Sequence, residues 1–307
     1  MIKKKIIKQL IMNFNNLTRL IKDLSSLKKD FYTVSKELEN KIFSISNTDL
    51  KNIISEIGII PENIKHDSTE EKLFSKATDI VLAKTFQELG LNSSVNKERA
   101  NCADVVAKSK LYDYTLVADA KAFRLSRTAK NQKDFKVKSM FDWKGDNDFA
   151  VLVCPYFQYP KTNSQIYAQA LDNNICLLSW EHLLLFLDNS IKENNQINLS
   201  KIWNISNELS KKVTVNNKYK NTNFHDNGNN MICNYLNIKA DKENKIFKNC
   251  KEIIISRGKE EIKYWNKEID KIKKYTKEKA IKELLKALKI EEKIRVITKF
   301  ISSLTDK

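Results

Sequence analysis

Glycine, proline and histidine are scarce in this chain. Its 307 residues include only five glycines and three prolines, so tight turns should be few and helices long. The three histidines, His66, His182 and His225, are far apart in the sequence, which argues against a zinc enzyme or an HNH nuclease. His182 stands beside an apolar helix face and is expected to be structural. No uncharged apolar run reaches roughly eighteen residues, so we expect no transmembrane helix.

Cysteine usage also excludes several classes of protein. The five cysteines are Cys102, Cys154, Cys176, Cys233 and Cys250, an odd number without a C-x-x-C pair. This pattern is typical of reduced core residues in a cytoplasmic protein and argues against disulfides. Residues 1–11 begin with a basic cluster, as signal peptides do, but Lys8 interrupts the apolar run and no small-residue cleavage site follows. We therefore expect an amphipathic helix there and a cytoplasmic location.

Basic residues are abundant. The chain has 55 Lys and Arg against 38 Asp and Glu, a formal net charge of +17, which indicates a polyanionic partner. Nucleic acid is the first candidate and an anionic membrane surface the second. A membrane-surface protein needs an exposed basic amphipathic helix, and residues 1–24 meet this requirement only in part.

Two short segments bring acids and a lysine together. Residues 116–121 form an apolar run that ends in Asp119 and Lys121, whose side chains share one face of a strand because alternate residues do. A second expected strand, residues 103–107, opens with Asp104, and a hairpin between the two places Asp104 beside Asp119. Two carboxylates can hold a divalent cation such as Mg²⁺, and a neighbouring lysine can orient or activate a water. This equipment is sufficient for metal-assisted cleavage of a phosphodiester.

A basic stretch, residues 121–138, follows directly. On a helix, Arg124, Arg127 and Asn131 share a face and are the candidates for reading base edges. The remaining candidates wind away from that face and suit phosphates; they are Lys130, Lys133 and Lys136. The alternative interpretation is an ordinary solvated charged helix.

The spacing of Asp104 and Asp119-Ala120-Lys121 resembles the PD-(D/E)xK nuclease motif. The residues around it, most clearly between about Gly58 and His182, resemble the HindIII family of type II restriction endonucleases. Four segments carry this resemblance: residues 68–77, 122–138, 157–160 and 179–183.

The resemblance implies both an activity and its partners. The activity is Mg²⁺-dependent cleavage of double-stranded DNA at the palindrome AAGCTT, after the first A, leaving 5′ overhangs. Asp104 and Asp119 would hold the metal, and Lys121 would orient or deprotonate the attacking water. The enzyme would act as a homodimer, alongside a DNA methyltransferase of the same restriction-modification system.

The expected fold is α/β and rich in helix, with a restriction-endonuclease-like mixed central sheet flanked by helices. The clearest helix, from Ser68 to Gly90, starts with a capping box of Ser68 and Glu71. Glu71 either closes this cap or faces the metal, and we keep it as a candidate catalytic residue. Residues 149–154 and 175–179 suit strands buried on both faces, with a crossover helix over 164–171 and a further helix from Trp180.

The remaining segments suggest a division of the chain. We expect an N-terminal helical region (1–60), a nuclease core (61–200) and a C-terminal helical region (201–307) packed as one compact unit with the core. Residues 204–248 have no clean period and are expected to form irregular, partly mobile surface loops with short helices. Apolar stripes over residues 17–24 and 262–288 either pack against the body of the protein or form a dimer contact. Because together they exceed what one core needs, we expect part of them to form a dimer contact.

Two functions fit these observations. A metal-dependent endonuclease is the leading hypothesis. The alternative is a non-catalytic, sequence-specific DNA-binding protein on a nuclease scaffold, for which the positive charge is sufficient. That alternative predicts loss of the acids, whereas Asp104, Asp119 and Lys121 are all present.

Overall fold

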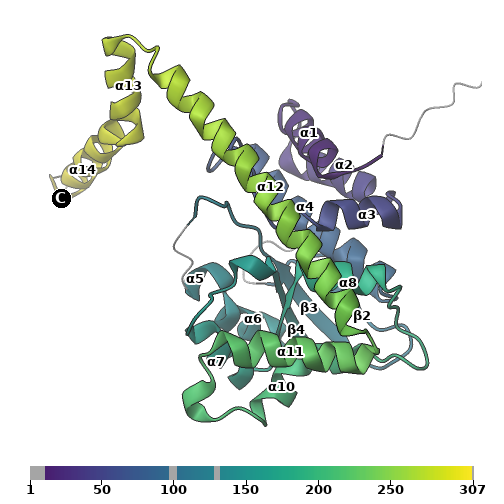
Figure 1. Cartoon of the computed structure of the whole chain (residues 1–307). Coiled ribbons are helices and arrows are strands. Elements are labelled where there is room, and N and C mark those ends of the chain that lie inside the picture. Colours follow the sequence, from purple (N-terminus) through teal and green to yellow (C-terminus); the bar gives the residue numbers. More distant parts are fainter. Residues whose placement is uncertain (1–10, 97–101, 128–131, 306–307) are drawn as a thin grey trace, which may run out of the picture. The chain divides into compact units, whose positions relative to one another are not determined.

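A five-stranded mixed sheet lies at the centre of the fold (Figure 1). The computed structural model describes residues 11–96, 102–127 and 132–305. The strands are β1 (Asn92–Val95), β2 (Val105–Lys108), β3 (Thr115–Ala120), β4 (Phe149–Cys154) and β5 (Ile175–Ser179), arranged in sequence order. β2 is antiparallel to both of its neighbours, β1 and β3, whereas β3, β4 and β5 run parallel. Helices flank this sheet, which confirms the expected fold class.

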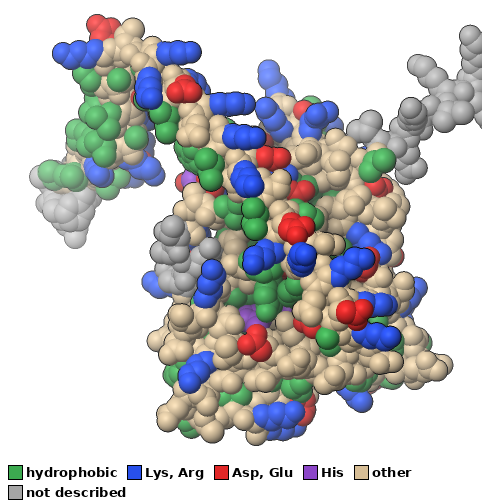
Figure 2. All heavy atoms as spheres, viewed as in Figure 1, with side chains coloured by type: hydrophobic (Ala, Val, Ile, Leu, Met, Phe, Trp, Pro, Cys, Tyr) green, Lys and Arg blue, Asp and Glu red, His purple; other side chains and the backbone are tan. Residues whose placement is uncertain are grey.

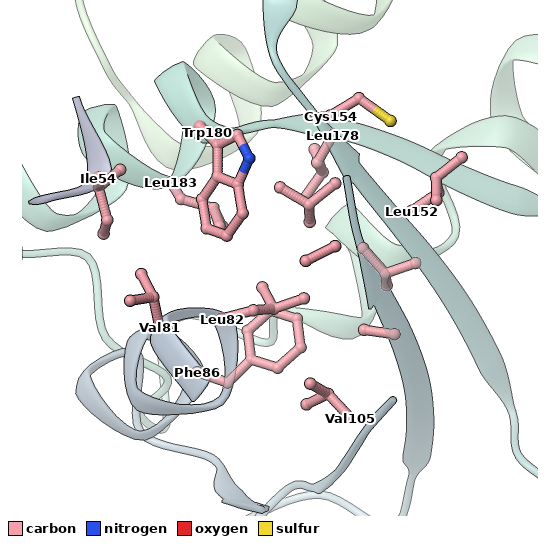
Figure 3. Packing of buried hydrophobic residues seen from close by; sticks show 14 of the residues in the cluster. Ile54, Val81, Leu82, Phe86, Val105, Leu152, Cys154, Leu178, Trp180 and Leu183 are labelled. Carbon is pink, nitrogen blue, oxygen red and sulfur yellow. The ribbon is translucent and has the colours of Figure 1, made fainter. Parts of the chain in front are cut away.

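Four helices precede the first strand in the sequence. They are α1 (Phe14–Ser25), α2 (Phe31–Phe43), α3 (Asn47–Ile54) and α4 (Thr69–Glu88). As expected, α4 begins at Ser68, whose hydroxyl accepts a hydrogen bond from the Glu71 backbone N–H (3.1 Å). Figure 3 shows Leu82 and Phe86 of α4 pointing toward the strands, in the same core as Val105 and Trp180. This buried face fixes α4 against the sheet.

The apolar stripe of α1 lies inside the protein. Leu17 and Ile21 are fully buried and Leu24 nearly so, and all three belong to the main hydrophobic core. The stripe over residues 17–24 therefore packs against the body of the chain and does not offer a subunit contact. Residues 1–10, where an amphipathic helix is expected, lie outside the described residues.

The basic stretch after β3 is not one helix. Residues 121–127 are extended or turn, and the following helices are α5 (Gln132–Phe135) and α6 (Val137–Lys144), separated by Lys136 in the left-handed region (φ 52°). The cause is tertiary: the Phe123 N–H donates to the Gly58 carbonyl (3.0 Å), and the Phe123 carbonyl accepts from Ile60 (3.2 Å). These bonds hold Phe123 extended, so helical spacing does not place Arg124 and Arg127 on one face.

The second half of the sheet has the expected connections. Between β4 and β5 lie the short 3-10 turn η1 (Tyr156–Gln158) and α7 (Gln165–Asp172), and α8 (Trp180–Asp188) follows β5. Both parallel strands are buried along almost their whole length, as their uninterrupted apolar runs predict.

The expectation of irregular structure over residues 204–248 is wrong. This part forms α10 (Ile205–Ser210), η2 (Val215–Asn217), α11 (Asn221–Leu236) and the start of α12 (Ala240–Ile272), after the short α9 (Ser200–Trp203). In α11 the buried side includes His225 and Gly228 as well as Phe224, Ile232 and Cys233. A histidine and a glycine at buried positions interrupt the apolar period, which hides the helix from a pattern based on apolar residues alone.

The chain divides into two compact units, Met1–Ser256 and Arg257–Lys307. The second contains the end of α12, with α13 (Lys277–Ala287) and α14 (Ile290–Thr305). The expected packing of residues 201–307 with the core remains a prediction for the part beyond Ser256. Among the helices that the structure describes, none is long and apolar enough to cross a membrane.

Candidate active site

The β2–β3 hairpin brings Asp104 and Asp119 together. Val105 pairs with Ala118 in the antiparallel register, so one step further along the ladder Asp104 lies opposite Asp119. A carboxylate oxygen of each lies within 4.8 Å of the other. The ammonium group of Lys121 contacts the Asp119 carboxylate. The predicted juxtaposition of these three side chains is confirmed by the structure.

A third acid, Asp79 of α4, completes the group. It offers a carboxylate oxygen within 4.8 Å of both Asp104 and Asp119, and its side chain is buried. The sequence prediction missed it because the apolar stripe of α4 leaves Asp79 on the side that would normally face solvent. A signal was nevertheless present: Asp79 directly precedes the apolar run 80–83, and a helix that is apolar all round is buried all round. A charge in such a segment indicates a site.

Crowding and burial dominate the electrostatics of the three acids. Burial, followed by the hydrogen bond with Asp119 and the charge of Asp119, raises the pKa of Asp104 to about 6. Burial, followed by the charges of Asp104 and Asp119, holds the pKa of Asp79 well above its usual range. Three neighbouring carboxylates therefore cannot all ionise cheaply unless a cation joins them.

Lys121 is held in its charged form. Burial alone would lower the pKa of this lysine, but the charge of Asp119 and the hydrogen bond to it outweigh burial, so the pKa is raised. Its side chain is only 15% exposed. Lys121 is therefore a fixed positive charge beside the acids.

The three acids fit a hard divalent cation. Mg²⁺, Ca²⁺ and Mn²⁺ prefer oxygen ligands, and carboxylates are the usual protein donors. Asp79 of α4, Asp104 directly before β2 and Asp119 of β3 supply one oxygen each. A bound cation would remove the repulsion that contributes to the raised pKa of Asp79 and Asp104.

Glu71 does not lie with these acids. One of its carboxylate oxygens accepts a hydrogen bond from the Asp67 N–H (2.9 Å), and the other forms an ion pair with Arg124 (2.5 Å). Glu71 thus closes the start of α4 and holds Arg124, and the structure does not bring it to the metal-ligand group.

Arg124 is buried and engaged within the protein. Besides pairing with Glu71, it donates to the Pro61 carbonyl (2.7 Å), and the residue is only 6% exposed. A guanidinium held in this way joins the start of α4 to the strand end. The structure therefore contradicts the expectation that Arg124 projects toward base edges.

Arg124→Ala should destabilise the fold by about 2 to 3 kcal/mol, because it leaves a partly buried Glu71 carboxylate without its partner. Urea denaturation measures the change. Arg127→Ala is the matched control: Arg127 pairs with Asp134 but is about half exposed, so its loss should cost at most about 0.5 kcal/mol. An Arg124→Ala protein that is as stable as the wild type, yet loses affinity for one DNA sequence only, would restore the base-reading role.

Of the other DNA-binding candidates, the structure describes Lys133 and Lys136. Both are exposed. The Lys136 ammonium lies 5.5 Å from the centre of the Trp143 ring. Lys136 also lines the cleft described next. Lys130 and Asn131 lie outside the described residues.

The acids open onto a cleft of about 780 Å³. Its walls come from α2, α4, the end of β1 and the segment after β3, and they include Asp79, Asp104, Asp119 and Lys121. Several further lysines on α2 and α4, which the sequence did not single out, also line it. The metal-ligand group is therefore reachable by a large anionic substrate.

His182 has the structural role expected for it. Its Nδ1 accepts from the Ser179 N–H (3.1 Å) in a capping box at the start of α8, and its Nε2 lies 2.8 Å from the Asn229 side-chain oxygen. Burial lowers the pKa of His182 to about 4. A neutral histidine that caps a helix is not a general base of the cleft.

The family model and the curated relative indicate the same family. The family model for the HindIII restriction endonuclease matches residues 14–301. The type II restriction enzyme HindIII of Haemophilus influenzae is 44% identical over 288 residues, which cover 94% of this chain and 95% of that enzyme. Among solved structures, restriction endonuclease FokI matches with a TM-score of 0.35 and 14% identity, over 59% of this chain and 34% of the FokI chain.

Proposed function

This chain belongs to the HindIII restriction endonuclease family, and we propose on that premise that it cleaves double-stranded DNA at a palindrome with Mg²⁺ as cofactor. The observation that carries the proposal is the group of Asp79, Asp104 and Asp119 with the charged Lys121, set in a cleft. Carboxylates that hold Mg²⁺ beside a fixed cation match the needs of phosphodiester hydrolysis.

Each of these side chains has a role. Asp104 and Asp119, with Asp79 as a third ligand, hold the metal. When bound, Mg²⁺ acidifies a water and stabilises the negative charge that develops on the phosphate. Lys121, whose raised pKa keeps it protonated, orients the attacking water and a phosphate oxygen as a cation instead of accepting a proton. Hydrolysis is direct, so no covalent nucleophile is needed.

The proposed target is AAGCTT, cut after the first A to leave 5′ overhangs. The identity of 44% to the Haemophilus enzyme over nearly the whole chain supports a shared target. Such an enzyme works in the cytoplasm with a DNA methyltransferase of the same specificity, which protects the host's own sites. The methyltransferase is a functional partner, not a bound subunit.

One experiment tests both activity and target. A plasmid of known sequence is incubated with the protein, with and without Mg²⁺, and the ends are sequenced. Cuts at AAGCTT with 5′ overhangs, in Mg²⁺ only, are expected. Cuts at another palindrome would show that the proposed target is wrong and the proposed activity is right. Tight binding without any cut would favour the non-catalytic DNA-binding protein, an alternative that no observation at present supports.

The working unit is a two-fold homodimer. A palindrome presents the same scissile phosphate twice, whereas each chain has one set of Asp104, Asp119 and Lys121. The contact surface lies in the second unit, where apolar side chains are exposed and gather over α13 and α14 (Figure 2). These side chains include Ile262, Trp265, Ile269, Ile272, Ile281, Leu284, Leu285, Leu288, Ile294 and Ile297, each at least 44% exposed.

Sedimentation at micromolar concentration should give a particle of about twice the chain mass, because a contiguous apolar surface of this kind is stable in water only when covered. Trp265→Glu with Leu285→Glu should shift it to monomer, while the control Lys263→Glu, an exposed polar neighbour, should leave the dimer intact. Heterodimers of wild-type and Asp119→Ala chains should nick one strand. A strict monomer that makes double-strand breaks in one binding event would contradict this assembly.

A further inference from the structure

Helix α4 presents a row of polar residues to the cleft. Thr69, Lys72, Lys76 and Asp79 all line it, and their spacings of three, four and three residues place them on one side of the helix. The row leads from the start of α4 to the metal-ligand group. Because the opposite side of α4 is packed into the core, the row is held rigidly.

Lys72 and Lys76 differ from most lysines around them. Lys36 of α2 pairs with Glu39 (2.8 Å), and Lys84 of α4 pairs with Glu88 (2.7 Å). Within the described part of the chain, the ammonium groups of Lys72 and Lys76 make no hydrogen bond or ion pair. Lys72 is exposed and Lys76 half-buried. Two lysines without partners on the wall of a cleft are free to bind an anion.

Lys76 also acts on the acids. Its positive charge lowers the pKa of both Asp79 and Asp104, against the larger effect of burial. Lys76 lines the same cleft as Asp79, Asp104 and Asp119, so an anion bound beside these acids also lies near the Lys76 ammonium. Its position one turn before Asp79 on the same helix face agrees with this closeness.

With a phosphodiester bound, the acids, Lys121 and one divalent ion need one further positive charge for neutrality. Three ionised carboxylates and Lys121 sum to −2, which one divalent ion cancels. A phosphodiester brings a further negative charge into a largely buried site, where an unbalanced charge is costly. Lys76 supplies the matching positive charge from α4.

We propose that α4 is a DNA-binding helix whose Lys76 contacts the phosphate being cleaved and whose Lys72, about 6 Å further along the axis, contacts a neighbouring phosphate of the same strand. This role rests on the proposed function and adds to it a second set of phosphate contacts, beyond the basic stretch after β3. Since phosphates carry no sequence, both lysines affect affinity for every duplex alike.

The test measures DNA binding by the full-length protein at several salt concentrations, with Ca²⁺ in place of Mg²⁺, on a duplex with the cleaved sequence and on a random duplex. Lys72→Ala and Lys76→Ala should each reduce the slope of log affinity against log salt by about 0.9 on both duplexes. Lys76→Arg keeps the charge and should keep the slope. Lys76→Ala should also slow single-turnover cleavage by about tenfold to a hundredfold.

Lys41→Ala is the matched control, because Lys41 is an exposed lysine of α2 that does not line the cleft; its salt slope and cleavage rate should equal those of the wild type. If the wild type binds and cuts DNA but both α4 variants have the same salt slope as Lys41→Ala, the proposed role of α4 is wrong and the proposed function stands. A wild-type protein that neither binds nor cuts duplex DNA would instead overturn the proposed function. If Lys76→Ala fails to fold, Lys72→Ala, at an exposed position, carries the test.

Discussion

Asp119→Ala should reduce DNA cleavage by at least about a thousandfold. Asp119 is close to every other member of the site: its carboxylate lies near those of Asp104 and Asp79 and pairs with Lys121. Its removal takes away a metal ligand and, at the same time, the charge that keeps the pKa of the buried Lys121 high. Single-turnover cleavage of a plasmid in Mg²⁺ measures the loss.

The fold and DNA binding should survive this change, because β3 is held by its ladders to β2 and β4 rather than by the Asp119 side chain. Asp188→Asn, at the exposed end of α8, is the matched control and should cut at the wild-type rate. Lys121→Ala should lose activity as Asp119→Ala does. Wild-type cleavage in either variant would remove that residue from the mechanism.

The sequence was sufficient to predict the hairpin that carries Asp104, Asp119 and Lys121. Strand periodicity is strict, so a two-residue spacing places Asp119 and Lys121 on one face, and a short connection leaves only one register for Asp104. The buried strands β4 and β5 were equally clear, because a continuous apolar run bounded by turn residues suits only a strand covered on both faces. In both cases local pattern and tertiary environment agree.

The errors occurred where tertiary contacts override local pattern. The residues after β3 have a helical composition, but backbone hydrogen bonds between Phe123 and residues 58–60 hold them extended, and Arg124 turns inward to Glu71. The prediction for residues 204–248 missed a regular helix, because His225 and Gly228 occupy buried positions where the pattern requires apolar residues. Neither effect is visible without knowing which distant residues are neighbours.

Asp79 illustrates a third limit. Periodicity identifies the most apolar side of a helix, but it cannot tell whether the other side meets solvent or a second layer of protein. In α4 that side lines the cleft, and Asp79 is buried there beside the other acids of the site. Glu71 is a candidate catalytic residue by sequence, with a role in the helix cap as the alternative, and the structure places it in the cap.

Asp79→Asn should therefore have two opposite effects, measured on activity and on stability. Cleavage in Mg²⁺ should fall by about a hundredfold or more, because one of three metal ligands is lost. Without metal the variant should be more stable than the wild type by about 1 to 2 kcal/mol, since a buried carboxylate beside two others is replaced by a neutral amide. Residues placed for function at the expense of stability behave in this way.

The dependence on pH follows from the raised pKa of Asp79. A folded-state pKa above the unfolded value means that folding favours the protonated acid, so this contribution to stability is present at low pH and is lost as pH rises through the folded pKa. In a chelator, the stability advantage of Asp79→Asn should accordingly be small near pH 4 and grow toward pH 8. Urea denaturation at several pH values measures it.

Added metal should reverse the order of stability. A divalent ion at a hundred times its dissociation constant stabilises the wild type by about 2.7 kcal/mol, and Asp79→Asn should show most of that gain lost at the same concentration. Glu70→Gln, which removes an acid from the same helix outside the cleft, is the matched control and should respond to metal as the wild type does. If Asp79→Asn cuts DNA at the wild-type rate and gains the same stability from metal, Asp79 is not a ligand, and the site rests on Asp104 and Asp119 alone.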